Sequence, residues 1–371
     1  MFSMQEFQVF LCGDVMIGRG IDQILPHPSD PRLYEPYVKD AKDYVLLAEN
    51  TSGEIPRGVC GNYLWGDGLY ELKKRNLSAR IINLETSITK SNTPDLYKGI
   101  HYKMNPDNID AITSAAIDVC ALANNHILDW GTPGLLETLE TLHKANIRFS
   151  GAGHNIQEAQ APAILSIPGH KKRILVFSMG IHSSGIPSKW RATLKKPGLW
   201  LLDNLNANTI RQIKERIDYH REPCDLCIVS IHWGGNWGYA IPKQHQNFAH
   251  ALIDEIGVNI IHGHSSHHPI GIEIYNHCPI LYGCGDLIND YEGILGYEEF
   301  QKDLSLMYFL TFDDHLYLKK LELVPLIRKN FCLHYPSDSV CQSVFKTITK
   351  ASMLLDTHFE LENRTIHWIM E

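Results

Sequence analysis

The sequence predicts an α/β protein in which short buried strands alternate with amphipathic helices. Apolar runs such as FQVFLCG, ARIINL and DLCIVSI are short, as expected for buried strands. Segments with helical periodicity separate these runs, and one of them carries Ile210, Ile213 and Ile217 on a single stripe. The chain has 371 residues, of which 44% are hydrophobic and 20% charged, a composition typical of a globular protein with a large core.

The apolar runs and periodic segments give the order of the expected elements. Strands are expected at 7–13, 79–84, 118–123, 173–179, 225–231 and 258–263. Helices are expected at 41–48, 68–75, 108–116, 134–145, 206–220 and 244–256. Two Pro- and Gly-rich stretches, 26–36 and 51–68, are expected to be loops that connect elements or act as lids.

The C-terminal third has a different pattern. Consecutive strands are expected at 270–275, 279–283, 304–312 and 316–326, so the sheet gains antiparallel members there. A final helix, roughly 340–355, is expected to cover an edge. We therefore predict a single domain over 1–371, to which the part from about 300 to 371 adds strands and a closing helix.

Composition narrows the function classes. Lys and Arg number 34 and Asp and Glu 42, so the formal charge is 34 − 42 = −8. This excess of acid argues against a dedicated nucleic-acid binder. No apolar run reaches about 18 residues, and the N-terminus lacks a basic region, so neither a membrane anchor nor a signal peptide is expected. Nine scattered cysteines favour reduced thiols and a cytoplasmic location; Cys224 and Cys227 allow a zinc knuckle as the alternative reading.

Polar residues that can bind metal or transfer protons stand at the ends of five predicted strands. They are Asp14, Glu85, the group Asn124, Asn125 and His126 with Asp129 one turn later, His232 and His264. The carboxyl ends of parallel strands lie along one edge of a sheet, so these residues are expected to meet in one pocket. Carboxylates, imidazoles and an amide suit Mn, Fe or Zn, and two such ions about 3.5–4 Å apart serve in-line attack on phosphorus.

Each of these residues also has a purely structural explanation. Asp14 can cap a turn, Glu85 can pair with a surface lysine, and His232 can be a hydrogen-bonded core histidine. The Asn-Asn-His stretch can be a turn. The crowding of histidines in IIHGHSSHHP, at positions 262, 264, 267 and 268, is harder to explain without a ligand or acid–base role.

Weaker signals lie near the same strand ends. Arg19 in GRG is a candidate for holding an anionic substrate, or an ordinary loop arginine. Trp233, Trp237 and Tyr239 in HWGGNWGY are candidate pocket walls, or core packing. The stretch GCGDLINDYEG supplies Asp286, Asp290 and Glu292, which either support the site or belong to a solvated turn.

The blocks GDVMIGRG, NLETSIT, ALANNHILDWG, SIHWGGNWGY, GHSSHHPIGIEIY and LYGCGDLINDYEG, in this order, resemble the CapA/PgsA-type capsule and poly-γ-glutamate synthesis proteins. The resemblance runs from about Phe7 to the last helix. Members of that family look like relatives of the calcineurin-type metallophosphoesterases. The resemblance therefore implies a four-layer α/β/β/α sandwich with mixed sheets and a dinuclear metal site between strand ends.

The resemblance also implies roles for individual residues. Asp14 matches the first aspartate of the superfamily, but Met16 stands where a histidine is usual. The implied metal ligands are Asp14, Glu85, Asn125, His232, His264 and His267. His262 and His264 are an alternative to the last pair because their spacing is that of the superfamily. With these departures, two ions, one ion or none remain open.

The leading expectation is a metal-dependent hydrolase of the CapA/metallophosphoesterase type, using divalent ions, two of Mn, Fe or Zn. Metal-activated water would attack a phosphate ester, with His126 as proton donor oriented by Asp129, while Arg19 holds an anionic group beside Asn124 and Trp233. A poly-γ-glutamate factor, hydrolysing amides or handling polymer, is the second reading, and a non-catalytic binding protein the third. The expected partner is a small anionic or polymeric substrate. Neither nucleic acid binding nor a membrane anchor is expected. The sequence does not indicate whether the protein forms oligomers.

Overall fold

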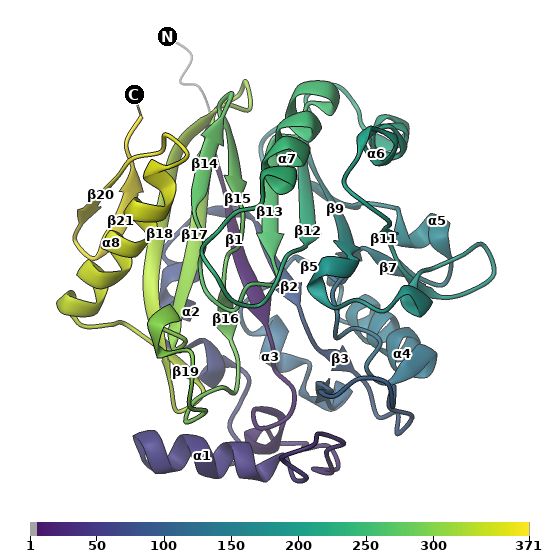
Figure 1. Ribbon diagram of the computed structural model, residues 1–371, viewed down its shortest axis with the longest axis vertical. Helices are drawn as coiled ribbons and strands as arrows, with labels where there is room; N and C mark the ends of the chain where they lie inside the picture. The colour runs from purple at the N-terminus through teal and green to yellow at the C-terminus, as the bar shows by residue number, and fades with distance from the viewer. Residues whose placement is uncertain (1–5, 371) are drawn as a thin grey trace.

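Two β-sheets packed face to face form the centre of the computed structural model, which describes residues 6–370 (Figure 1). The first sheet follows the order β20-β21-β18-β17-β1-β2-β5-β6, with β16 beside β1 and β19 beside β18. Its strands are β1 (Phe7–Val15), β2 (Leu77–Leu84), β5 (Val119–Ala121), β6 (Arg148–Ser150), β16 (Asp286–Ile288), β17 (Leu304–Phe312), β18 (Leu318–Lys329), β19 (Cys332–His334), β20 (Phe359–Glu362) and β21 (Thr365–Trp368). The strands β16, β1, β2, β5 and β6 are parallel, and the C-terminal strands are antiparallel to their neighbours.

The second sheet has the order β11-β9-β12-β13-β15-β14, with β8 beside β9. Its strands are β8 (Ala163–Ser166), β9 (Arg173–Ile181), β11 (Leu201–Leu202), β12 (Leu226–His232), β13 (Ile260–His264), β14 (Ile272–Tyr275) and β15 (Cys278–Leu281). Two short ribbons complete the β-structure: β3 (Ser87–Ile88) with β4 (Lys103–Met104), and β7 (Ala152–Gly153) with β10 (Gly198–Leu199).

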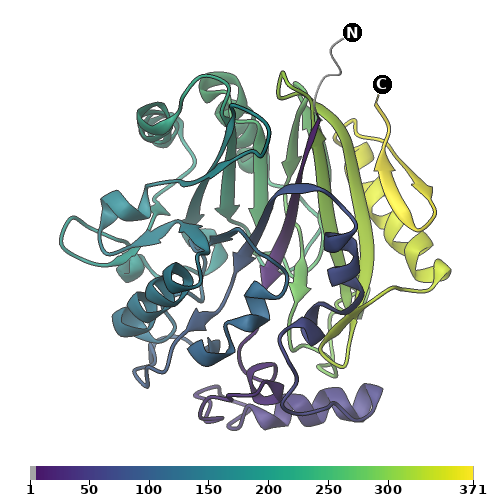
Figure 2. The same ribbon diagram turned by 180° about the vertical axis from the view of Figure 1, so that it is seen from behind.

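Helices surround the two sheets, and most of them cover the outer faces (Figure 1). They are α1 (Lys42–Ser52), α2 (Asn62–Lys73), α3 (Asp110–Thr113), α4 (Gly131–Lys144), α5 (Ile156–Ala159), α6 (Ala207–His220), α7 (Lys243–Ile256) and α8 (Asp338–Met353). Single 3-10 turns occur at Asp22–Ile24, Pro106–Asn108, His182–Ser184, Ser188–Trp190 and Glu298–Phe300. Figure 2 shows α2, α3 and α4 over the first sheet, whereas α6 and α7 pack on the second (Figure 1).

Strand β1 shows why this layering follows from the sequence. Its residues are almost all apolar because both faces are buried. Val9 and Leu11 pack between the sheets against residues such as Ile228 of β12. Phe10 and Cys12 point the other way, into the cluster beneath the helices of the first sheet. The expected α/β/β/α sandwich with mixed sheets is therefore confirmed.

Three details differ from the sequence expectations. The expected loop 51–68 contains the start of α2, whose interior has a kink at Gly66 with φ 40°. The strand patterns alone suggested one parallel sheet, but the parallel strands are divided between two sheets, as the resemblance implied, so the strand ends approach one another across the sandwich. Strands β20 and β21 were not expected, because their short, partly exposed sequences FELE and TIHW lack a clear apolar run.

The last helix, α8, lies against β14 of the second sheet and β20 of the first. Each of these is the terminal strand of its sheet, so the helix closes the side where the two edges meet (Figure 1). Within residues 6–370, no helix is both long and apolar enough to cross a membrane.

Candidate active site

Residues from both sheets meet where β1, β12 and β13 end. Asp14, His232 and His264 are fully buried, and their ligand atoms lie within 4.8 Å of one another. A second group, Asp14 with His267 and Asp286, meets the same limit. Asp14 belongs to both groups, so a carboxylate stands between two candidate ion positions, as in dinuclear centres with a bridging carboxylate.

Strand pairing brings these residues together. His232 and His264 are direct neighbours in the parallel register of β12 and β13. Asp14 and Asp286 are neighbours in the register of β1 and β16. The last pair requires a close backbone approach, since a Cβ atom on Gly13 would lie 1.8 Å from the carbonyl oxygen of Gly285. Glycine is therefore needed beside the first aspartate.

Two buried polar atoms at this point fit a cation. Asp14 Oδ2 and His232 Nε2 are buried and have no hydrogen-bond partner among residues 6–370. Burial and the nearby charge of Asp286 raise the pKa of Asp14 to about 7. Burial and the charge of Asp14 also raise the pKa of Glu85 well above its usual range. A divalent cation would satisfy the orphaned atoms and relieve the repulsion between the carboxylates, so the residues present fit such an ion.

Glu85, another predicted ligand, lies at the margin of these groups, and the predicted ligand Asn125 stands on the loop after β5. Glu85 Oε2 accepts a hydrogen bond from Asn83 Nδ2 at 2.9 Å and lies 3.9 Å from His232 Nδ1. Asn83 also donates to Asp14 Oδ1 at 2.7 Å, so it holds both carboxylates in place. The Oδ1 atom of Asn125 is buried without a hydrogen-bond partner among the described residues. Glu85 thus lies beside His232 but outside the two candidate ligand groups, and the roles of Glu85 and Asn125 as ligands stay predictions.

The structure distinguishes the two alternative histidine pairs. His262 is fully buried and hydrogen-bonds the carbonyl oxygen of Cys12 at 2.7 Å through Nε2 and Ser230 Oγ at 3.1 Å through Nδ1. The same Ser230 hydroxyl lies 2.8 Å from His264 Nε2, which leaves His264 Nδ1 facing His232 Nδ1 at 2.8 Å. His264 and His267 thus join the carboxylates, and His262 supports the site from behind.

His126 and Asp129 form a hydrogen-bonded pair beside the candidate ion positions. His126 Nδ1 donates to Asp129 Oδ2 at 2.7 Å, and the other ring nitrogen lies 3.9 Å from Glu85 Oε1. Asp129 Oδ2 also accepts from the backbone N–H of Tyr102, and its Oδ1 pairs with Lys98 at 2.9 Å. This network fixes the imidazole with Nε2 directed at the centre.

Burial and neighbouring charges together set the protonation of this pair. It lowers the pKa of His126 to about 4, although the charge of Asp129 acts in the opposite direction. Burial alone would raise the pKa of Asp129, but His126 and Lys98 hold it below its usual range. In the absence of other charges, the pair therefore consists of a neutral imidazole and an ionised carboxylate at neutral pH.

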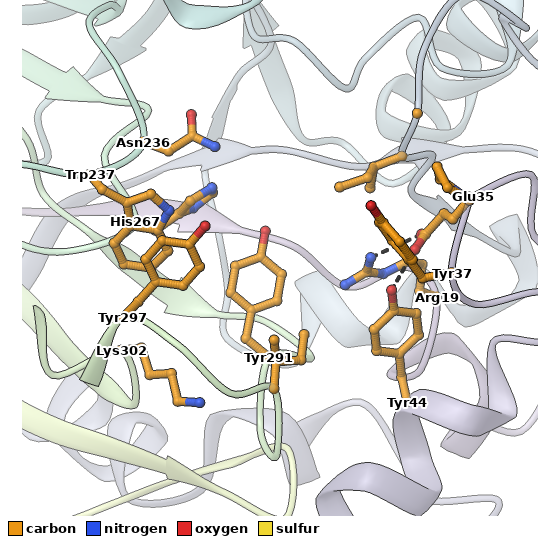
Figure 3. Close-up of a pocket in the computed structure, with 14 residues that line it drawn as sticks. Arg19, Glu35, Tyr37, Tyr44, Asn236, Trp237, His267, Tyr291, Tyr297 and Lys302 are labelled. Carbon is orange, nitrogen blue, oxygen red and sulfur yellow. Dashed lines mark hydrogen bonds and ion pairs between the residues drawn. The ribbon is translucent and has the colours of Figure 1, made fainter. Parts of the chain in front are cut away.

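A cavity of about 560 Å³ opens beside His267. Figure 3 shows that Arg19, Tyr44 and Tyr37 line one side and Trp237, Tyr297 and Lys302 the other, with Tyr291 between them. Because His267 belongs both to the cavity wall and to the candidate metal centre, a bound molecule can reach from one to the other.

Arg19 lines this cavity, but its guanidinium forms ion pairs with two carboxylates of the protein. It is 4% exposed and forms ion pairs with Asp290 at 2.6 Å and Glu35 at 3.0 Å. Its guanidinium also lies 3.9 Å from the centre of the Tyr44 ring. Two carboxylates compensate its charge, so the arginine primarily ties three loops together at the cavity.

Asn124 and Trp233 are the other residues predicted to contact substrate. Neither lines the cavity beside His267, and both side chains hydrogen-bond other parts of the protein. Asn124 Nδ2 donates to Asn83 Oδ1 at 3.0 Å, and its Oδ1 accepts from the backbone N–H of His126, so it shapes the loop that carries His126 and Asp129. Trp233 donates to a backbone carbonyl and stacks on His245 in the core of the second sheet. Trp237, four residues later, is the tryptophan that lines the cavity.

Sequence reasoning underrated or missed several residues of the site. Asp286 had only a weak signal, because it begins a strand of three residues after a glycine-rich turn. Asn83, Lys98 and Ser230 had no recognisable motif; Asn83 and Ser230 lie within apolar strands, and an alternation of polar and apolar residues toward the strand end was the available sign. Their contacts come from tertiary packing and could not be found by spacing alone.

Comparison with known proteins settles the family. The family model described as "Bacterial capsule synthesis protein PGA_cap" matches residues 8–291. The chain belongs to this family. The CapA-type resemblance read from the sequence is thereby confirmed, and the relatives include proteins named for capsule biosynthesis and for polyglutamine synthesis.

Three relatives of this PGA_cap protein show the range of similarity. A "Probable polyglutamine synthesis accessory protein" of Mycobacterium tuberculosis is 43% identical over 93% of this chain and 90% of its own length. The "Capsule biosynthesis protein CapA" of Bacillus anthracis is 25% identical over 77% of this chain and 60% of its own. The "PGA biosynthesis protein CapA" of Bacillus subtilis is 26% identical over 78% of this chain and 65% of its own.

Proposed function

We propose that this PGA_cap protein is a metal-dependent hydrolase of phosphate esters. The observation that carries the proposal is the pair of overlapping ligand groups that share Asp14, set beside the hydrogen-bonded His126–Asp129 pair. Metal-dependent hydrolysis uses a carboxylate shared by two ions, imidazole ligands and an adjacent group that transfers a proton.

The residues that would hold two divalent ions are those brought together by the sandwich. One position would use Asp14, His232 and His264, the other Asp14, His267 and Asp286, with Glu85 and Asn125 at the margin. Bound ions of the Mn, Fe or Zn type supply Lewis acidity, which polarises an ester oxygen and makes water a stronger nucleophile at neutral pH.

The protein's own part in the reaction is to bind the ester and to transfer the proton. An anionic ester beside His126 favours the imidazolium by charge attraction and so opposes the effect of burial. The imidazolium then donates its Nε2 proton to the leaving oxygen, while Asp129 holds Nδ1 and stabilises the positive ring. Lys98 keeps Asp129 ionised and in position.

The partner we propose is a small anionic or polymeric substrate. The cavity beside His267 has a volume in the range of small-molecule sites. With Lys302 on one wall, it offers positive charge next to the candidate centre.

Metal removal and site variants test the proposal. The chelator-treated protein is expected to lose phosphatase or phosphodiesterase activity and to regain it with Mn²⁺. His126→Ala should lower kcat by roughly 10²–10⁴-fold, and Asp14→Asn should reduce the metal content per chain. His315→Ala, which changes an exposed histidine on a distant turn, is the matched control. Activity that survives metal removal, or an unchanged rate in the His126 variant, contradicts the proposal.

A role in handling a glutamate polymer is the second candidate, and the names of the relatives favour it. The same centre would then polarise an amide carbonyl, or only bind the chain. Incubation with poly-γ-glutamate and sizing of the product separates these functions. Shortened chains indicate amide hydrolysis, whereas intact chains together with a low metal content indicate a binding protein.

A further inference from the structure

We infer that the cavity selects substrates that carry a planar ring, which stacks on Tyr297, and a second acidic group, which pairs with Lys302. The inference rests on the proposed phosphate-ester function and specifies its substrate class. The residues that carry it are Tyr297, Trp237, Tyr37 and Lys302, none of which belongs to the candidate metal centre.

The first argument is the way in which Tyr297 is presented. Its ring lies parallel to that of Trp237, with centroids 4.1 Å apart and planes inclined by 7°. Trp237 is itself supported by further rings, those of His268 and Phe300. One face of Tyr297 is therefore covered by a rigid stack. No other ring among residues 6–370 contacts Tyr297, which is 48% exposed and lines the cavity with its free side.

The backbone of Tyr297 supports this interpretation. The residue has φ 74° and ψ 16°, a left-handed conformation that is unfavourable for a bulky side chain. A glycine at this position would relieve the strain, as Gly293 and Gly296 do nearby with positive φ. The chain instead keeps an aromatic ring in a strained conformation at the edge of a cavity, which is a common property of binding sites.

The opposite wall adds large, exposed side chains to the mouth of the cavity. Figure 3 shows Tyr37 across the cavity from Tyr297, on the side of Arg19. Tyr37 is 96% exposed, and Ile100, which also lines the cavity, is 42% exposed. Large exposed apolar side chains gathered around one mouth mark a ligand site more often than a bare surface. Rings stack on aromatic side chains with little dependence on their identity.

Lys302 is the residue that would recognise the acidic group of the substrate. It lines the same cavity, on the side of Tyr297 (Figure 3). It forms no ion pair with a carboxylate of residues 6–370, although Glu298 is near enough to interact electrostatically. The carbonyl oxygen of Lys302 accepts a hydrogen bond from the buried Arg328, which fixes its backbone. A substrate carboxylate or phosphate is the natural partner for the ammonium group of Lys302.

Binding to matched ligands tests the ring contact. Calorimetry on the Mn²⁺-supplied protein compares phenyl phosphate with ethyl phosphate, which carries the same charge without a ring. We expect phenyl phosphate to bind about tenfold more tightly. Tyr297→Ala should remove this preference, and Tyr297→Phe should retain it. Tyr219→Ala, at an exposed tyrosine of α6 outside the cavity, is the control.

A second comparison tests the lysine. 4-Carboxyphenyl phosphate should bind more tightly than phenyl phosphate to the wild-type protein, and Lys302→Met should abolish the difference while leaving phenyl phosphate unaffected.

The outcomes separate this inference from the proposed function. Equal binding of phenyl and ethyl phosphate, a preference that survives Tyr297→Ala, or the absence of binding by either ligand overturns the ring contact. Equal binding of the two aryl phosphates by the wild-type protein overturns the role of Lys302. If phenyl phosphate binds with the expected preference but releases no inorganic phosphate, the ring site stands and the hydrolase proposal fails.

Discussion

Replacing Asp14 by asparagine should stabilise the metal-free protein while impairing its metal binding. Burial and the charge of Asp286 raise the pKa of this carboxyl from 3.8 to about 7. In the unfolded chain it returns to its ordinary value, so the folded protein binds this proton more tightly than the unfolded chain does. The contribution to stability is therefore complete at low pH and is lost as the pH rises to 7 and above.

The size of the effect follows from the shift. One pKa unit corresponds to about 1.4 kcal/mol, so the ionised group destabilises the fully deprotonated protein by about 4 kcal/mol, of which about 2–3 kcal/mol is lost between pH 5 and pH 8. Asparagine is isosteric and can still accept the hydrogen bond from Asn83. The variant lacks the charge. The difference in the free energy of unfolding between the variant and the wild-type protein should therefore grow by about 2–3 kcal/mol from pH 5 to pH 8.

Urea unfolding of chelator-treated protein at pH 5 and pH 8 measures the difference. Asp43→Asn, at an exposed position of α1, controls for the general effect of removing a negative charge. Added Mn²⁺ should stabilise the wild-type protein more than the Asp14 variant. Parallel loss of stability in the wild-type protein and the Asp14→Asn variant between the two pH values would refute the reasoning.

Three other substitutions test separate parts of the structure. Arg19→Met leaves Asp290 without its buried partner and should lower the free energy of unfolding by about 3–5 kcal/mol, measured by urea titration; a loss below about 1 kcal/mol contradicts the buried ion pair. Ser230→Ala removes the hydroxyl that orients His264 and should weaken Mn²⁺ binding by roughly 10–100-fold in calorimetry, whereas unchanged affinity assigns the serine to packing alone. Ser337→Ala removes the side-chain cap of α8 and should cost about 1 kcal/mol in thermal unfolding, with metal binding unaffected as the internal control.

The fold could be predicted in outline because its strands are buried on both faces. Continuous apolar runs such as the one in β1 can exist only between two packed layers, so the sequence reveals them. The apolar runs alone do not show which strand belongs to which sheet, because a run in one sheet has the same composition as a run in the other. Strands β20 and β21 escaped notice because they are short and partly exposed, and pairing with β18 stabilises them.

The candidate site was predictable where a residue ends a strand. Asp14, His232 and His264 do so, and parallel register brings such positions together. Asp286 lies at the start of a strand, on the far side of a glycine turn, so the same reasoning did not reach it. The ion pairs of Arg19 could not be predicted either. Its partners, Glu35 and Asp290, lie on other loops, and sequence spacing does not indicate that these loops meet.

Strand β1 depends on residues that lie outside the matched family region. The family match ends at residue 291, but β17, from Leu304 to Phe312, provides the antiparallel partner along one side of β1. A fragment cut at the end of the match would leave the backbone N–H and C=O groups of a central, apolar strand facing water. Such a piece would invite intermolecular strand addition, so recombinant versions need the whole C-terminal region to avoid aggregation.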